Sequence, residues 1–330
     1  MNCLCCGKPI TDKATEQEKN TRWHNRCVKK FFGTRVLPDI EVTQEMMEWL
    51  AIESSNKGLT VPGVQKKMSL HLDSSGDKPR LTLVNYPTGY ILKPNTPDYL
   101  CLPEAEYLVM QMAEKAGIKT VPHALIRIKA QDNVFAYITK RIDRRDGKML
   151  AMEDFCQLDG RLTEDKYKGS YERCAKIIQR YSSRTGLDVT ELFIRVVFSF
   201  IVGNSDMHLK NFSLIETDEN SQMYILSDAY DMLPVNIVNP ADTEQMALTL
   251  NGKKRNLHRN DFLKFAEACG IEKTISERLI DRLINHCNEF IDAVDESFLT
   301  AELKNDMQLL VVNRIIALEK ESMQNSDTDI

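Results

Sequence analysis

Residues 189–202 constrain the fold of this chain more than any other segment. In helical geometry, apolar side chains such as Leu192, Val196 and Phe200 would cover most of the helix circumference, and Gly203 follows directly. A helix that is apolar on most sides lies in the core of a large domain, and glycine is common just past a helix end. The sequence therefore predicts a buried helix at the centre of a helical domain.

A short polar loop follows this helix and leads into a predicted strand over residues 212–215. In this loop, Asp206 and Asn211 are separated by four residues. The Asp-x4-Asn spacing is typical of kinase catalytic loops, in which the aspartate receives the proton of the substrate hydroxyl and the asparagine binds a metal ion. Asp231 follows a predicted strand over residues 223–226 and is the candidate for a second Mg²⁺ ligand.

Each of these polar residues also has an ordinary structural explanation. Asp206 suits a turn cap, His208 a hydrogen-bonded core histidine, Asn211 a turn and Asp231 a helix cap. Together, in this order and with a suitable lysine upstream, they favour phosphoryl transfer. That reaction needs an oriented hydroxyl, an in-line phosphate and Mg²⁺ to neutralise its charge.

The upstream lysine is Lys93, at the end of a predicted strand over residues 90–93. A strand lysine of this kind contacts the α- and β-phosphates of ATP when a carboxylate on the next helix orients it. That helix is predicted to begin near Pro103 and to end at Gly117, with Glu104 and Glu106 in its first turn. We expect Glu106 to be the partner of Lys93, although the helix dipole alone also explains acidic residues there.

Short alternating segments around Lys93 predict a β-rich small lobe. Further strands are expected over residues 64–72, 80–84, 121–129 and 135–142. At the start of the first strand, a glycine that lets the backbone approach a phosphate is combined with two lysines in Pro62-Gly63-Val64-Gln65-Lys66-Lys67. This signal is weak alone, because glycine beside proline is common in ordinary turns and paired lysines are common at solvated edges.

Four residues near the N-terminus have the spacing of metal ligands. Cys3, Cys6, His24 and Cys27 form the pattern Cys-x2-Cys…His-x2-Cys. Three thiolates and one imidazole make a closed tetrahedral site of the structural zinc type, which leaves no position for a catalytic water. Cys5 is an alternative ligand in place of Cys3 or Cys6, and a reduced cluster without metal is the competing interpretation.

Basic and aromatic residues are interleaved between Arg22 and Arg35, a stretch that includes the second pair of potential ligands. They form either a docking face for a partner or nucleic acid, or a solvated face whose aromatic side chains pack on the rest of the protein. The second interpretation is favoured. A net charge of -5 and a pI near 5.8 also argue against a general binder of nucleic-acid backbones.

With 330 residues, the chain is long enough for two lobes and a small appendage. We expect an α+β fold with a zinc-knuckle segment over residues 1–40, a small ATP-binding lobe over 41–145 and a helical catalytic lobe over 146–330. The catalytic lobe should end with helices over 261–269, 275–294 and 301–320. No membrane span or signal peptide is recognisable, so we predict a cytoplasmic protein with reduced cysteines.

Eight segments in a fixed order resemble the HipA and HipT family of serine/threonine kinase toxins. The resemblance covers about residues 60–320 and rests on residues 63–67, 90–94, 102–106, 141–144, 153–157, 166–167, 203–212 and 229–231. It implies a two-lobed protein-kinase-like fold and a protein kinase that depends on ATP and Mg²⁺. Family members phosphorylate proteins, notably aminoacyl-tRNA synthetases, and arrest growth until a cognate antitoxin restrains them.

The resemblance also implies roles for individual residues. Asp206 is the catalytic base, Lys93 contacts the ATP phosphates, and Asn211 and Asp231 bind Mg²⁺. The other implied nucleotide contacts are those of Pro62, Gly63, Val64, Gln65, Lys66 and Lys67 with the phosphates, of Lys140, Arg141 and Ile142 with adenine, and of His208 and Tyr230 near the nucleotide.

Two departures from the family pattern concern regulation. HipA-type chains begin with an extra subdomain, whereas this chain has only the cysteine segment and is closer to HipT-type kinases, so a separate small inhibitory subunit is expected. We expect the protein to contact DNA only indirectly, through an antitoxin. The family usually carries a regulatory serine just before Gly63, where Thr60 and Pro62 stand here. Any autophosphorylation is therefore expected at Thr60, unless Thr60 is only a β-forming residue before a turn.

Two other functions stay open. One is a catalytically idle nucleotide-binding regulator that acts through its zinc segment, and the other is a small-molecule kinase on the same fold. The presence of Lys93, Asp206, Asn211 and Asp231 argues against the idle regulator.

Overall fold

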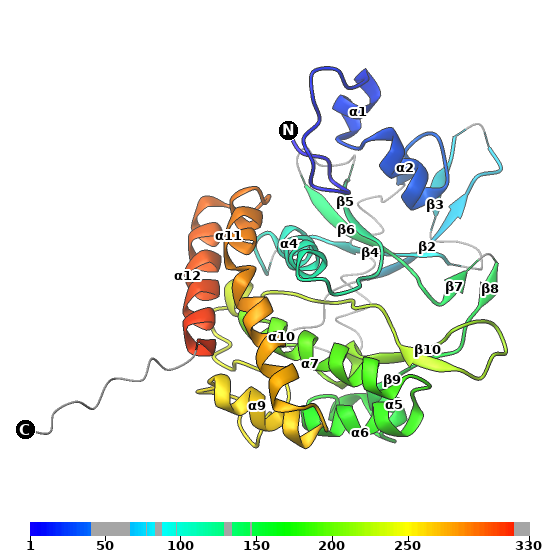
Figure 1. Ribbon diagram of the computed structural model, residues 1–330. Coiled ribbons are helices and arrows are strands. Elements are labelled where there is room, and N and C mark those ends of the chain that lie inside the picture. Colours follow the sequence, from blue (N-terminus) through cyan, green and yellow to red (C-terminus); the bar gives the residue numbers. More distant parts are fainter. Residues whose placement is uncertain are drawn as a thin grey trace, which may run out of the picture.

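The computed structural model describes residues 1–40, 67–76, 78–82, 88–96, 98–128, 134–145 and 147–319. Within these ranges the protein has the expected α+β architecture, in which a β-rich small lobe lies on a mainly helical large lobe (Figure 1). In this part of the chain, no helix is both long and apolar enough to cross a membrane.

A six-stranded sheet forms the small lobe, in the order β1-β3-β2-β4-β6-β5. Neighbouring strands are antiparallel except for the β1–β3 pair. The helix α4 (Leu102–Lys115) packs on the sheet and is followed by Gly117, whose φ of 80° suits the predicted helix end. The strands are β1 (Asp39–Ile40), β2 (Met68–Asp73), β3 (Arg80–Thr82), β4 (Tyr90–Pro94), β5 (His123–Arg127) and β6 (Phe135–Lys140).

The N-terminal segment, with helices α1 (Glu16–Thr21) and α2 (Asn25–Phe32), packs against this sheet. The indole nitrogen of Trp23 donates to the carbonyl of Leu125 at 3.2 Å, and the Leu125 amide donates to the carbonyl of Leu4 at 2.8 Å. The ring of Phe32 lies 5.5 Å from that of Trp23 and 5.4 Å from that of Tyr90, centroid to centroid. The aromatic residues of this segment therefore belong to the small-lobe core, as their packing interpretation predicts.

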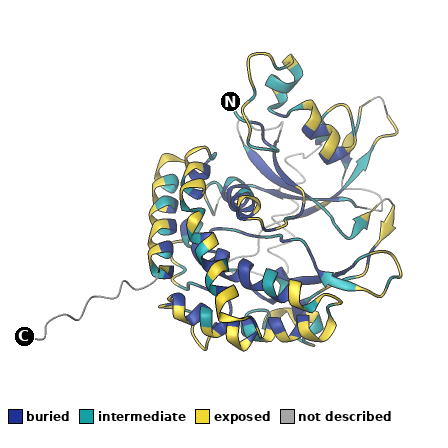
Figure 2. Ribbon diagram, viewed as in Figure 1, coloured by how far each residue is buried: buried dark blue, intermediate teal, exposed yellow. Residues whose placement is uncertain are grey.

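The central helix of the large lobe is α7 (Thr185–Ile201), and it is buried along most of its length (Figure 2). It begins at Thr185, before the predicted start at residue 189. This polar first turn is compatible with burial because the Asp188 carboxylate has three donors: Ser182 Oγ at 2.6 Å, Arg184 Nε at 2.8 Å and the Leu226 amide at 2.7 Å. Asp188 thereby ties the start of α7 to the strand that precedes Asp231.

The C-terminal region differs from the sequence prediction at one point. The single helix expected over residues 275–294 is wrong, because the chain forms two helices, α10 (Lys273–Asn285) and α11 (Cys287–Asp295), which meet at His286. The break lets α10 pack on α7 while α11 turns to pack on α4 of the small lobe. The helices α9 (Arg259–Ala268) and α12 (Ala301–Leu318) lie close to their predicted positions.

Shorter elements surround the junction of the two lobes. A three-stranded sheet has the order β11-β10-β9, and β7 pairs with β8. The remaining elements are β7 (Arg144–Arg145), β8 (Lys148–Met149), β9 (Met152–Asp154), α5 (Phe155–Leu158), η1 (Thr163–Asp165), α6 (Tyr171–Tyr181), η2 (Leu209–Asn211), β10 (Ser213–Glu216), β11 (Tyr224–Leu226) and α8 (Val235–Val238).

Candidate active site

Gly203 sets the direction in which the chain leaves α7 and enters the polar loop. Gly203 has a φ of 69°, and a Cβ there would lie 3.0 Å from Cδ1 of Leu310 on α12. A larger residue would therefore be both strained and in contact with a neighbouring helix. Because the loop leaves α7 at this fixed point, Asp206 is placed at the junction of the two lobes.

Hydrogen bonds inside the loop fix its backbone around Asp206. The side-chain nitrogen of Asn211 donates to the Asp206 carbonyl at 2.8 Å, and Asn204 Oδ1 accepts from the Asp206 amide at 3.3 Å. The hydroxyl of Tyr171 on α6 donates to the Met207 carbonyl at 3.0 Å. Because the side-chain nitrogen of Asn211 donates this hydrogen bond, the side-chain oxygen is the atom available to a metal ion.

The Asp206 carboxylate accepts a hydrogen bond from the hydroxyl of Tyr167. Burial raises the pKa of Asp206, while the Tyr167 hydrogen bond opposes that rise and the charges of Asp231 and Asp242 add to it. The side chain is still 29% exposed, so another molecule can reach it. The arrangement suits a general base, which must be held in place and remain accessible.

His208 lies beside Asp206, with 3.9 Å between its Nε2 atom and Asp206 Oδ1. Burial, together with the nearby charge of Lys166, lowers the pKa of His208 to about 4, so the imidazole is neutral near pH 7. Its Nδ1 atom is buried without a hydrogen-bond partner among the described residues. His208 is therefore not the fully hydrogen-bonded core histidine that was one interpretation of the sequence.

On the small-lobe side of the site, Lys93 at the end of β4 is almost fully buried between two carboxylates. Its Nζ atom lies 2.6 Å from Oε1 of Glu106 on α4 and forms an ion pair with Asp231. Burial alone would lower the pKa of Lys93, but Asp231 and Glu106 reverse this effect and raise it. The predicted contact between Lys93 and Glu106 is thus present in the structure, and Lys93 is fully charged.

Asp231 follows β11 in a left-handed conformation, with a φ of 53°. The preceding residue anchors this turn, because the Tyr230 hydroxyl is hydrogen-bonded to Ser213 Oγ at 2.5 Å and donates to the Lys210 carbonyl at 3.1 Å. Burial opposes ionisation of Asp231, but Lys93 overrides it and holds the pKa of the carboxyl below its usual range. An ionised carboxylate and the Asn211 amide oxygen are the kind of oxygen ligands that Mg²⁺ binds.

Part of the predicted nucleotide site lies outside the described residues, namely Thr60, Pro62, Gly63, Val64, Gln65 and Lys66. Lys67 directly precedes β2, and its charge helps to lower the pKa of Asp231, which places it near the site. At the predicted hinge, the amides of Lys140 and Arg141 donate to the carbonyls of Pro122 and Gly89, both at 2.9 Å. The backbone amides of Lys140 and Arg141 therefore already donate hydrogen bonds within the small lobe. Ile142 follows them at the end of the predicted hinge.

At the N-terminus, the metal-binding atoms of Cys3, Cys6, His24 and Cys27 all lie within 4.8 Å of one another. His24 Nδ1 is 3.4 Å from the sulfur of Cys6 and 3.9 Å from that of Cys27. Its other ring nitrogen lies 3.3 Å from the carbonyl of Pro9, the second contact that usually orients a histidine ligand. These separations suit a tetrahedral zinc ion bound by three sulfurs and one nitrogen, and Cys5 is not part of the cluster.

We expect about one zinc ion per chain in protein purified under reducing conditions. Replacing His24 and Cys27 together by alanine should remove the metal and lower the melting temperature of the small lobe, because the finger shares a core with that lobe. Cys5→Ala is the matched control and should retain the ion. Elemental analysis that finds no metal in fresh, reduced wild-type protein would contradict the zinc assignment.

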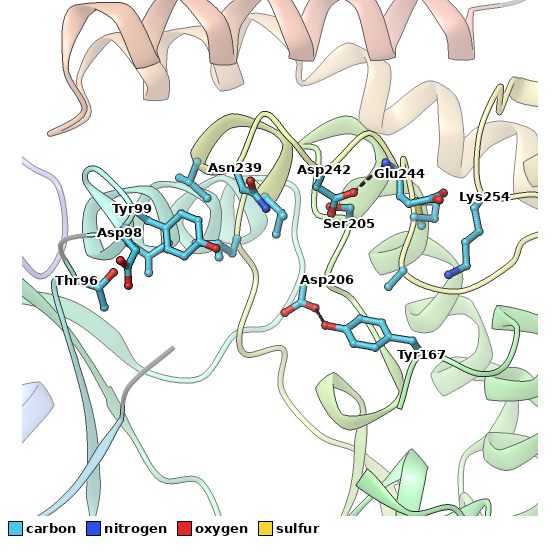
Figure 3. A pocket seen from close by; sticks show the side chains of 16 residues that line it. Thr96, Asp98, Tyr99, Tyr167, Ser205, Asp206, Asn239, Asp242, Glu244 and Lys254 are labelled. Carbon is cyan, nitrogen blue, oxygen red and sulfur yellow. Dashed lines mark hydrogen bonds between the residues drawn. The ribbon is translucent and has the colours of Figure 1, made fainter. Parts of the chain in front are cut away.

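Two features of the site had no signal in the sequence. Tyr167 was expected only as part of a matched segment, and its contact with Asp206 joins residues 39 apart. Asp206 also lines a pocket of about 240 Å³ whose other walls come from the β4–α4 connection and from residues 233–254 (Figure 3). These pocket residues are scattered in loops, so no local spacing marks them.

Comparison with known proteins relates this chain to a family of kinase-like proteins. The sequence model of the HipA-like C-terminal domain family matches residues 59–291. A relative described as a putative kinase from Haemophilus influenzae is 26% identical over 78% of this chain and 82% of its own length. The putative kinases Y4mE and Y4dM of Sinorhizobium fredii are 29% and 30% identical over 72% and 74% of this chain. The chain spans only 57% and 60% of those two relatives.

Two solved structures show a similar fold. HipA of Shewanella oneidensis, determined with HipB and operator DNA, has a TM-score of 0.66 at 17% identity, over 79% of this chain and 65% of that one. The Helicobacter pylori proinflammatory kinase CtkA has a TM-score of 0.53 at 16% identity, over 72% of this chain and 87% of that one. Both likenesses concern the fold, which is the two-lobed fold of these kinases.

Proposed function

This chain belongs to the family of HipA-like C-terminal domains, and from this premise we propose that it is an ATP-dependent protein kinase that phosphorylates serine or threonine. The family and the relatives described as putative kinases support a kinase-like function. The observation that supports the finer proposal is the ion-paired cluster of Lys93, Glu106 and Asp231, in which the charge of Asp231 is close enough to raise the pKa of the accessible Asp206 carboxylate.

In the proposed mechanism, Glu106 orients Lys93 so that its ammonium group binds the ATP phosphates. Asp231 and the side-chain oxygen of Asn211 would hold Mg²⁺, which neutralises phosphate charge when bound. Asp206 accepts the proton of the substrate hydroxyl as its oxygen attacks the γ-phosphorus and the bond to the ADP oxygen breaks. The products are a phosphoprotein, ADP and a proton that Asp206 releases to solvent.

Tyr167 positions the base in this mechanism, and its replacement by phenylalanine should change the pH dependence of the reaction. Loss of the hydroxyl removes a hydrogen bond to the carboxylate, so the pKa of Asp206 should rise further above its ordinary value of 3.8. The base works only when ionised, so activity disappears as pH falls through that pKa. In Tyr167→Phe the loss should occur at higher pH than in wild type.

Profiles of kcat/KM against pH measure this effect, because they report the pKa values of the free enzyme. Tyr181→Phe is the control, since Tyr181 lies on the surface and stacks on Arg180. An acid limb that is the same in Tyr167→Phe and wild type would show that Tyr167 does not act on the base.

We also propose that the kinase is the toxin of a toxin–antitoxin pair. The Shewanella HipA structure contains HipB and operator DNA, and an antitoxin partner of this chain would likewise link it to DNA. By family precedent the substrate is an aminoacyl-tRNA synthetase, and a separate small subunit would inhibit the kinase. Autophosphorylation at Thr60 stays a prediction.

Induced expression in the original host tests the toxin proposal. Wild-type protein should arrest growth, and co-expression of the antitoxin should restore it. The arrested cells should contain a new phosphoserine or phosphothreonine on their target protein. Normal growth at a confirmed high level of the free kinase would contradict the toxin role while leaving the kinase proposal intact.

A further inference from the structure

The pocket beside Asp206 lies between the two lobes, and carboxylates dominate its polar lining (Figure 3). Asp98 comes from the β4–α4 connection, while Asp242 and Glu244 come from the segment after α8. Lys254 is the one basic side chain among the described residues that line the pocket. The pocket therefore carries an excess of negative charge next to the proposed catalytic base.

These carboxylates are only partly neutralised within the described part of the chain. Asp242 accepts hydrogen bonds from two uncharged donors, Ser205 Oγ at 2.7 Å and the Glu244 amide at 2.9 Å, and forms no ion pair there. Asp98 is exposed and has no hydrogen bond or ion pair among those residues. The Asp242 charge is close enough to raise the pKa values of both Asp206 and Tyr167.

Two buried polar atoms in the lining also have no partner. Glu244 is paired with Arg255 through Oε1 at 3.0 Å, but its Oε2 atom is buried without a hydrogen bond in the described structure. Thr96 is only 8% exposed, and its hydroxyl likewise has no partner there. A buried polar atom without a partner costs free energy, and these two atoms belong to residues at opposite ends of the pocket (Figure 3). The Glu244 atom, on the same side as Asp242, indicates a place for a donor group from another molecule.

The remaining wall of the pocket is apolar and is formed by Leu102, Leu233, Val235, Val238 and Met246. At about 240 Å³ the cavity is smaller than the roughly 300–1,000 Å³ of typical small-molecule sites. An apolar wall and carboxylates at its polar side suit one long side chain with a methylene stem and a cationic head. Lysine and arginine are the residues with this structure, and both are donors only.

We propose that this pocket determines substrate specificity by binding a lysine or arginine side chain that lies within a few residues of the phosphorylated serine or threonine. Asp242, on the side of the pocket near the base, binds the cationic head, and the apolar wall packs on its stem. Asp98, at the opposite end of the pocket, adds to the negative charge of the lining (Figure 3). Because Asp206 lines the same pocket, the bound side chain places the neighbouring hydroxyl at the base. This inference rests on the proposed kinase function and adds to it the chemical class of the substrate segment.

A positional peptide library tests the inference with the full-length protein and MgATP. Each peptide has a central serine or threonine, and one flanking position at a time is fixed as arginine, lysine, alanine or glutamate. At one or more positions close to the acceptor, arginine or lysine should increase phosphate transfer about tenfold over alanine, equivalent to about 1.4 kcal/mol. Glutamate at the same position should lower phosphate transfer below that measured with the alanine peptide.

Two variants connect the preference to the pocket. Asp242→Asn should reduce the ratio of basic to alanine peptides to about threefold or less, because it removes the charge nearest the cationic head. Asp98→Asn should reduce the ratio by a smaller factor, because Asp98 lies at the other end of the pocket. Asp98 holds no neighbouring residue in place, so the effect of Asp98→Asn reports the loss of charge alone. Glu267→Gln, on the exposed face of α9, is the matched control and should keep the tenfold ratio.

The outcomes separate this inference from the proposed function. Transfer without a basic preference, or a preference unchanged in both aspartate variants, would overturn the inference and leave the kinase function standing. Turnover of ATP without transfer to any peptide would also overturn it, because the pocket would not then serve a protein segment. Absence of both transfer and ATP turnover would contradict the proposed function, and the inference with it.

Discussion

Replacing Asp206 by asparagine should lower the rate of phosphoryl transfer by about 10²- to 10⁴-fold, the usual contribution of a general base. Affinity for MgATP should stay within about twofold of wild type, because Lys93, Glu106 and Asp231 hold the nucleotide in the proposed mechanism. Asparagine keeps the shape of the side chain, and its oxygen can still accept the hydrogen bond from Tyr167. The variant therefore removes the base and leaves the loop around it in place.

Single-turnover rates and calorimetric titration with MgATP measure the two parts of this prediction separately. Asp292→Asn is a suitable control, because Asp292 is an exposed aspartate on α11, away from the site. Equal transfer rates for Asp206→Asn and wild type would remove Asp206 from the mechanism. A loss of nucleotide affinity as large as the loss of rate would indicate that Asp206 acts on ATP binding instead.

Replacing Asp231 by asparagine should weaken MgATP binding by about tenfold or more and remove most of the advantage that Mg²⁺ gives to ATP binding. Asparagine is preferable to alanine, because the φ of 53° at this position favours asparagine over other residues with a side chain. Lys93 would keep Glu106 as its buried counter-ion, so the folded state should lose little stability. A large loss of affinity with a small change in melting temperature is the expected combination.

Calorimetric titration with ATP, in the presence and absence of Mg²⁺, tests this prediction. The matched control is Asp228→Asn. Asp228 is close in the sequence, but its partner at 2.9 Å is Lys119, which is 80% exposed, so this surface pair should contribute little. Unchanged MgATP affinity in Asp231→Asn would mean that Asp231 is not a metal ligand and that its pairing with Lys93 is only structural.

The parts of the fold and site that could be predicted are those with a strong local signal. Lys93 lies at the end of an apolar strand, and Asp206 and Asn211 lie just after the strongly apolar helix α7, so spacing and flanking elements locate them together. The four potential zinc ligands are likewise identified by two short pairs. In these cases neighbouring residues determine the local structure, and tertiary contacts complete it.

The features that could not be predicted depend on contacts between residues far apart in the sequence. The break between α10 and α11 is one example, because apolar spacing continues across His286 and only the packing of α11 on α4 requires the change of direction. The pocket is another, since Asp98 and Asp242 come from separate lobes and neither lies in a periodic segment. Tyr167 acquires its role only when folding brings it to Asp206.

The most direct test of a protein kinase with Asp206 as its base is a transfer assay in a lysate of the host, using ATP labelled in its γ-phosphate. With wild-type protein, we expect strong label on one or a few host proteins, and phosphoamino-acid analysis should find it on serine or threonine. Asp206→Asn at the same concentration should transfer no label above the lysate alone. No added label with wild-type protein, or equal label with the two proteins, would contradict the account.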